Sequence, residues 1–267
     1  MDLSLFDRRE VLEALFPLVY SPNYASDPEP LSPAGVPIYH VEVEEGVTID
    51  CGFWVNSRES PSILYFHGNG ETVAGYSFIA PFYTERGINL CVVDYRGYGS
   101  SGGKPTVTNM LADAHIVLNR FKTKTARDGY NDKLFVMGRS LGSLPALELA
   151  FHHQDEISGL IIESGTANNF SQMWSNLGLN QKEPALDEQS LFLNKVKIRQ
   201  VRIPTLIIHG ENDELIPVRE GQELYKNSAA PQKKILIIPG AGHNDIMTVK
   251  QDLYFDTIGE FIQNNIR

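Results

Sequence analysis

The spacing of apolar and polar residues along the chain predicts a series of strands and helices. Residues 38–43 and 47–55 alternate between the two kinds and are separated by Glu44-Glu45-Gly46. Alternation at every second residue is typical of strands with one solvated face, so we expect an antiparallel hairpin. Continuous apolar runs, typical of strands covered on both faces, begin with 62–66. Further strands are expected at 88–93, 133–137, 157–164 and 234–238. The segment 204–217 is expected to begin with another strand, starting at Pro204, and to continue into an acidic loop.

Helices are expected between these strands, at 72–85 and 107–122, directly after Gly142, near Pro217, and at 248–262. A further amphipathic helix is predicted at the start of the chain, between Asp7 and Val19, and we expect it to pack against a sheet edge rather than on a membrane. Its apolar positions recur at helical spacing; they are Val11, Leu12, Leu15, Phe16 and Val19.

The expected elements fall into a short N-terminal segment and one domain. Residues 1–37 hold the first helix and, from Ser21 to Pro37, an extended connection with five prolines. Residues 38–267 carry the alternating strands and helices of a single α/β domain. The whole chain, with 267 residues of which 42% are hydrophobic, is large enough to form the core of one such domain. Within that domain, residues 165–202 have the least regular pattern, and we expect them to form a small cap.

Composition narrows the classes of function. The chain has 23 basic and 33 acidic residues, a net charge of −10, and no basic run, which argues against nucleic-acid binding. The two cysteines, Cys51 and Cys91, lie in expected strands, where thiols pack as small apolar groups. A disulfide between them stays open. Residues 1–10 lack the apolar core of a signal peptide, and no stretch is long enough to span a membrane, so we expect a cytoplasmic protein without membrane insertion.

Candidate chemistry centres on Gly138-Arg139-Ser140-Leu141-Gly142, which joins an expected strand to an expected helix. In a tight strand-to-helix turn, glycines two residues before and after the serine avoid steric clashes, and the serine hydroxyl is lifted clear of the sheet. A lone Gly-x-Ser-x-Gly is more often an ordinary loop. A serine nucleophile also needs a base, and the base needs an acid to fix its tautomer.

Both partners follow in the chain, in the order Ser, Asp, His. His243 lies on a glycine-flanked loop after the last expected strand, and Asp213 lies just past the end of the preceding one. Glu211 and Glu214 lie in the same loop as alternatives, and Glu211 is the second choice for the acid. No histidine or cysteine pair has the spacing of a zinc site, so no metal is expected. The other histidines are interpreted as loop, packing or surface residues; they are His40, His67, His115, His152, His153 and His209.

A second glycine-rich loop, His67-Gly68-Asn69-Gly70, follows an early strand. This loop is the first of five motifs along residues 38–267, and the other four are given below. With these motifs in this order, the chain resembles the α/β-hydrolases, and within them the small ABHD-like branch of serine hydrolases. The resemblance implies a mostly parallel sheet of about eight strands with helices on both faces. The other motifs are the loop 94–102, the serine turn 138–142, the acidic loop 209–213, and Gly242-His243.

The resemblance also implies roles for individual residues. Ser140 would be the nucleophile, His243 the base, and Asp213 the acid, while the backbone amides of Asn69 and Leu141 would bind the oxyanion. A serine at the turn is unlike the dehalogenase branch of the family, which has an aspartate there.

The expected activity is hydrolysis of a carboxylic ester or related acyl bond of a small-molecule substrate, without a cofactor. An acyl-thioesterase or a serine peptidase stays open as an alternative. So does a non-catalytic binding protein, because a fold does not fix a function.

Overall fold

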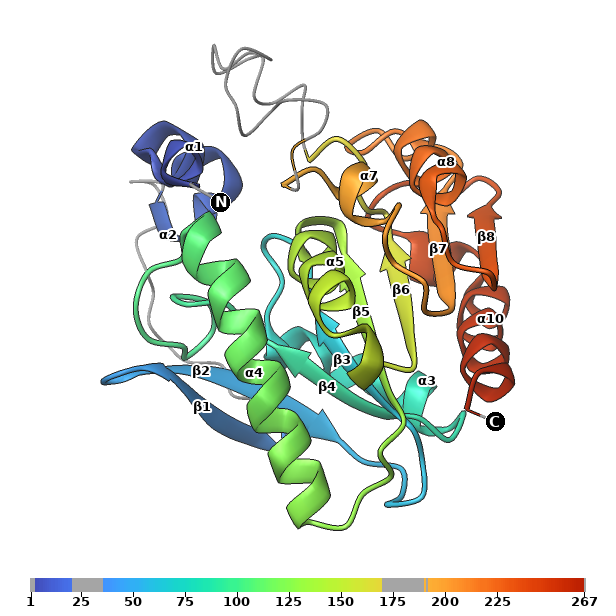
Figure 1. Cartoon of the computed structure of the whole chain (residues 1–267), viewed down its shortest axis with the longest axis horizontal. Coiled ribbons are helices and arrows are strands. Elements are labelled where there is room, and N and C mark those ends of the chain that lie inside the picture. Colours follow the sequence, from blue (N-terminus) through green and yellow to red (C-terminus); the bar gives the residue numbers. More distant parts are fainter. Residues whose placement is uncertain (1–2, 21–35, 170–189, 191, 267) are drawn as a thin grey trace. The chain divides into compact units, whose positions relative to one another are not determined.

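The computed structural model describes residues 3–20, 36–169, 190 and 192–266. The chain divides into two compact units, residues 2–132 and residues 133–267. Each unit contains strands that lie next to one another and helices that pack beside them (Figure 1). The two units are described in turn.

The first unit contains four strands in the order β1-β2-β4-β3. β1 pairs antiparallel with β2, which confirms the predicted hairpin, and β2 pairs antiparallel with β4. β3 and β4 run parallel. β3 is buried along its whole length, as its continuous apolar run predicts. The strands span Ile38–Glu44 (β1), Val47–Trp54 (β2), Ser62–Phe66 (β3) and Asn89–Val93 (β4).

The predicted N-terminal helix is interrupted rather than continuous. It forms η1 (Ser4–Asp7), α1 (Arg9–Leu15) and α2 (Pro17–Tyr20). The break before α2 follows from Pro17, which has no amide hydrogen and disfavours helical geometry in the residue before it; Phe16 has φ −128° and ψ 55°. The apolar positions of α1 are nevertheless buried, as their spacing predicts.

The other helices of this unit cover opposite faces of its strands. Residues 72–85 form η2 (Val73–Phe78) and α3 (Ala80–Thr84) instead of one helix. α4 (Val107–Arg127) is longer than predicted and begins with a capping box between Thr106 and Asn109. The Tyr65 ring packs on η2, whereas Phe66 shares a small cavity with residues of α4. Because successive strand residues face opposite ways, η2 and α4 lie on different faces.

The second unit contains four parallel strands in the order β5-β6-β7-β8. These strands complete the mostly parallel set of eight that the sequence predicts. The strands span Leu134–Arg139 (β5), Gly159–Glu163 (β6), Thr205–Gly210 (β7) and Lys233–Ile238 (β8). The helices are η3 (Ser140–Gly142), α5 (Ser143–His152), η4 (Gln154–Glu156), α7 (Asn194–Lys197), α8 (Val218–Asn227), α9 (Ile246–Val249) and α10 (Gln251–Asn264).

Helices of the second unit also lie on both faces. Gly138 of β5 faces α5, because an added Cβ would come 2.7 Å from the Ala146 Cβ. Phe135, three residues earlier on the same strand, packs edge-on against Phe261 of α10. An odd separation along a strand means opposite faces. The predicted closing helix is divided at Lys250, where the backbone leaves the helical region (φ −137°, ψ 62°).

Two predicted features lie largely outside the described residues. They are the extended connection, of which 21–35 are not described, and the cap at 165–202, of which 170–189 and 191 are not described. The two cysteines are buried free thiols.

Candidate active site

The turn after β5 holds Ser140 in an unusual backbone conformation. Its φ is +52°, in the left-handed region that non-glycine residues rarely adopt. Gly138 makes this turn possible, since an added Cβ would collide with the Gly142 carbonyl group. A strained turn between a strand and a helix directs the side chain of the residue in the turn away from the sheet. Ser140 is accordingly only partly buried, although its neighbours are buried.

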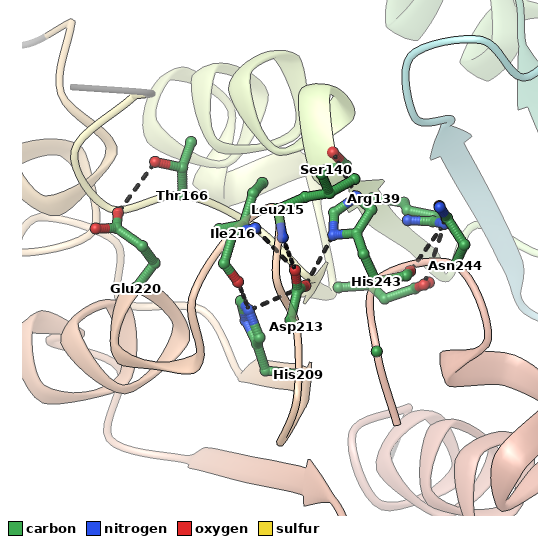
Figure 2. A network of polar contacts seen from close by, with 12 residues as sticks. Arg139, Ser140, Thr166, His209, Asp213, Leu215, Ile216, Glu220, His243 and Asn244 are labelled. Atoms are coloured by element: carbon green, nitrogen blue, oxygen red, sulfur yellow. Dashed lines mark hydrogen bonds and ion pairs between the residues drawn. The ribbon is translucent and has the colours of Figure 1, made fainter. Parts of the chain in front are cut away.

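Three side chains of the second unit form a continuous chain of hydrogen bonds (Figure 2). His243 Nε2 lies 3.1 Å from Ser140 Oγ, and His243 Nδ1 lies 2.8 Å from Asp213 Oδ2. A carboxylate only accepts hydrogen bonds, so Nδ1 donates to it and Nε2 is left to accept the serine proton. The structure thus brings together the three residues that the sequence singled out.

Asp213 is held by the loop that follows β7. Its Oδ1 accepts hydrogen bonds from the backbone amides of Leu215 (3.0 Å) and Ile216 (2.8 Å). Burial alone raises the pKa of Asp213, but hydrogen bonds from two imidazoles and a backbone amide outweigh burial and lower it. The carboxylate is therefore charged at neutral pH. Glu211, the alternative acid, instead accepts a hydrogen bond from the Gly240 amide.

Arg139, the residue before the serine, reaches the loop of His243. Its Nη2 donates to the His243 carbonyl oxygen (3.1 Å) and to Asn244 Oδ1 (3.3 Å). On its other side, Nε lies 3.5 Å from Glu163 Oε1 of β6. Tyr254 of α10 donates to Glu163 Oε2 at 2.6 Å. The sequence predicts no role for Arg139, and only its place inside the Gly-x-Ser-x-Gly motif could have drawn attention to these contacts.

A second imidazole lies beside Asp213. His209 is fully buried at the end of β7, and its Nε2 is 3.4 Å from Asp213 Oδ2. From its place in an expected strand, His209 is predicted to be a packing or surface residue. The signal that could have found it is its separation of four residues from Asp213, on the strand that leads into the acidic loop.

The two expected oxyanion donors belong to different units. Leu141 follows the serine in η3, at the start of a helical run, where backbone N–H groups have no partner within the helix. Asn69 follows β3 in the first unit, and its side-chain oxygen accepts a hydrogen bond from the Tyr98 hydroxyl at 2.7 Å.

His67, in the same loop as Asn69, is a buried structural residue. Its Nε2 lies 3.0 Å from Asp94 Oδ1 and its Nδ1 lies 2.8 Å from the Gly68 carbonyl oxygen. Both partners accept hydrogen bonds, so both ring nitrogens carry protons. Burial lowers the pKa of His67, but the hydrogen bond and charge of Asp94 outweigh burial and raise it.

The Hydrolase_4 family model, described as serine aminopeptidase S33, matches residues 58–181 and 194–247, which is more than half of the chain. The chain belongs to this family of α/β-hydrolases. It is thus a hydrolase by family, and the predicted resemblance is confirmed. Protein bem46 of Schizosaccharomyces pombe is 27% identical over 230 residues, covering 84% of this chain and 76% of that protein. Human alpha/beta hydrolase domain-containing protein 17B is 28% identical over 233 residues, covering 85% and 75%.

Solved structures confirm the α/β-hydrolase fold. The Pyrococcus furiosus esterase Pf2001 superposes with a TM-score of 0.70 at 20% identity, over 86% of this chain and 92% of that one. Est1E from Butyrivibrio proteoclasticus, in complex with ferulic acid, gives a TM-score of 0.69 at 20% identity, over 85% and 99%.

Two features are absent from the described residues. No helix in that part of the chain is long and apolar enough to cross a membrane. No group of three or more His, Cys, Asp or Glu side chains there is arranged to hold a metal ion.

Proposed function

We propose that this hydrolase cleaves a carboxylic ester or related acyl bond of a small molecule through Ser140, His243 and Asp213. The observation that carries the proposal is the hydrogen-bonded chain from Asp213 through His243 to Ser140. The arrangement supplies a nucleophile, a base in contact with it, and a charged acid that fixes the tautomer of the base.

The reaction would proceed in two halves. Ser140 Oγ attacks the acyl carbonyl carbon while His243 Nε2 takes the hydroxyl proton. The bond to the leaving group then breaks, and that proton passes to the leaving group, which departs as an alcohol. Water attacks the resulting acyl-serine ester, His243 takes a proton from it, and the acid is released as Ser140 regains its proton. Asp213 holds Nδ1 and stabilises the imidazolium in both halves.

The negative charge that develops on the carbonyl oxygen requires preorganised donors. We assign this role to the backbone amide of Leu141, on the strength of its place at the helix start beside the nucleophile. The amide of Asn69 stays a prediction from the sequence motif. The reaction needs only water besides the substrate.

Turnover of three substrate classes tests the proposal: p-nitrophenyl esters, aminoacyl anilides and acyl-CoA thioesters. We expect hydrolysis of p-nitrophenyl esters, and a fall of about 10^4-fold or more in Ser140→Ala and His243→Ala with unchanged melting temperatures. Graded acyl lengths would report the depth of the acyl site. Wild-type rates no faster than those of Ser140→Ala on every class would refute the proposal and favour a binding protein.

A peptidase is the second candidate, because the matching family model is described as a serine aminopeptidase. Aminoacyl anilides distinguish it from an esterase, and acyl-CoA substrates distinguish a thioesterase. A kcat/KM for anilides above that for esters would move the assignment to peptide bonds. The catalytic residues would stay the same.

A further inference from the structure

His209 is a buried titratable residue that the proposed reaction does not use. It lies in β7, one residue before the end of the strand, and none of its surface is exposed. Its Nε2 points to the loop that carries the acid, 2.7 Å from the Ile216 carbonyl oxygen and 3.4 Å from Asp213 Oδ2 (Figure 2).

The surroundings of the ring define its protonation. A carbonyl oxygen only accepts, so Nε2 must carry a hydrogen and donate it to Ile216. Nδ1 is buried and has no hydrogen-bond partner among the described residues. A proton on Nδ1 would therefore be an unsatisfied buried donor. His209 is thus a neutral imidazole protonated on Nε2.

We propose that His209 is a positioning residue for Asp213. It fixes the loop that carries Asp213, and it stabilises part of the negative charge of the Asp213 carboxylate. It ties down the Ile216 carbonyl group, while the amide of that same residue donates to Asp213 Oδ1 at 2.8 Å. The loop is thus fixed through both backbone polar groups of one residue, Ile216. The inference rests on the proposed function, since it concerns the acid of that triad.

The ring also shares one carboxylate oxygen with the base. Asp213 Oδ2 faces His243 Nδ1 at 2.8 Å and His209 Nε2 at 3.4 Å. The N–H of the neutral ring is donated to Ile216, so toward Oδ2 it acts as a polarised N–H group 3.4 Å away and not as a second hydrogen-bond donor. Its partial positive charge offsets part of the negative charge that Oδ2 presents to His243. Without His209, the full carboxylate charge would stabilise the protonated base, and the base would be neutralised only at higher pH.

Three other charged side chains near this end of the unit, Glu220, Arg139 and Glu163, have partners of their own. The Glu220 carboxylate of α8 accepts hydrogen bonds from the backbone amides of Ala167 and Asn168. Arg139 and Glu163 pair with each other. The pH effect of His209 is therefore expected to pass through Asp213.

A glycine of α8 makes room for the ring. An added Cβ at Gly221 would lie 2.5 Å from His209 Nδ1, closer than real contacts allow. Gly221→Ala therefore displaces the imidazole without removing it. This variant gives a second route to the same perturbation.

The test is the pH dependence of the rate at which a fluorophosphonate labels the protein. In His209→Leu and in Gly221→Ala we expect slower labelling and an acidic limb moved up by about 0.5 pH unit. In His209→Gln, whose amide nitrogen can take the place of Nε2 and donate to Ile216, we expect the wild-type limb. His40→Leu is the matched control, because His40 also pairs with an aspartate, Asp50 at 2.7 Å, outside the candidate site.

Gly75→Ala is the control for the glycine variant, since its added Cβ meets no atom within 4 Å. Near-UV circular dichroism checks that each variant is folded. If the wild type labels and folded Gly221→Ala and His209→Leu keep the wild-type limb or move it down, His209 only packs and the inference is wrong. If the wild type itself does not label, the proposed function fails first, and the inference fails with it.

Discussion

Arg139→Met removes a buried positive charge beside Ser140. The guanidinium lies 3.5 Å from the fully buried Glu163 carboxylate, so the substitution leaves that carboxylate charged without its arginine. It also removes two hydrogen bonds to the loop of His243, at 3.1 and 3.3 Å. Breaking a buried ion pair from one side costs about 3 to 5 kcal/mol, and we expect a loss of that size in the free energy of unfolding.

Urea unfolding measures this loss, and a double-mutant cycle with Glu163→Gln separates its parts. The two single variants should couple by more than about 1 kcal/mol, because the double variant no longer buries a carboxylate that has lost its arginine. Arg127→Met is the matched control: its salt bridge with Asp128 is exposed, so we expect no measurable change in the free energy of unfolding. A loss in Arg139→Met no larger than in this control would refute the reasoning.

Three further predictions concern the acid, the buried loop histidine and the nucleophile turn. Asp213→Asn should lower kcat for esters by about 10^4-fold through the wrong tautomer of the base, while Glu211→Gln stays near the wild type; the reverse result would reassign the acid. The pKa of His67 is raised above its ordinary 6.5, so the stability gained from Asp94 is complete below that pH and is lost as pH rises through the raised pKa. Urea midpoints of the wild type should therefore fall over this range relative to His67→Gln, and parallel curves would contradict the assignment. Gly138→Ala should lower the melting temperature or prevent folding, because its Cβ collides with backbone; an unchanged melting temperature would show that the turn adapts.

The candidate site was best predicted from the sequence where its side chains lie directly after the ends of strands. Ser140, Asp213 and His243 each follow an apolar run, and parallel strands place such ends at one edge of a sheet. Their spacing alone did not separate Asp213 from Glu211. That choice depends on loop geometry, since only Asp213 lies where two successive amides and an imidazole converge.

Other features depend on contacts between distant segments. Arg139 bonds to residues more than a hundred positions away, and His209 acquires its role only when the loop after β7 folds back on it. The N-terminal helix was wrongly predicted as continuous because its apolar period runs through Pro17, whose missing amide hydrogen breaks the helix.

The most direct test of the proposed mechanism is the site of covalent labelling. A fluorophosphonate should add to the intact protein once, peptide mapping should place the adduct on Ser140, and Ser140→Ala should show no added mass. An adduct on another residue, or folded wild-type protein that stays unlabelled at saturating probe, would contradict a nucleophilic Ser140.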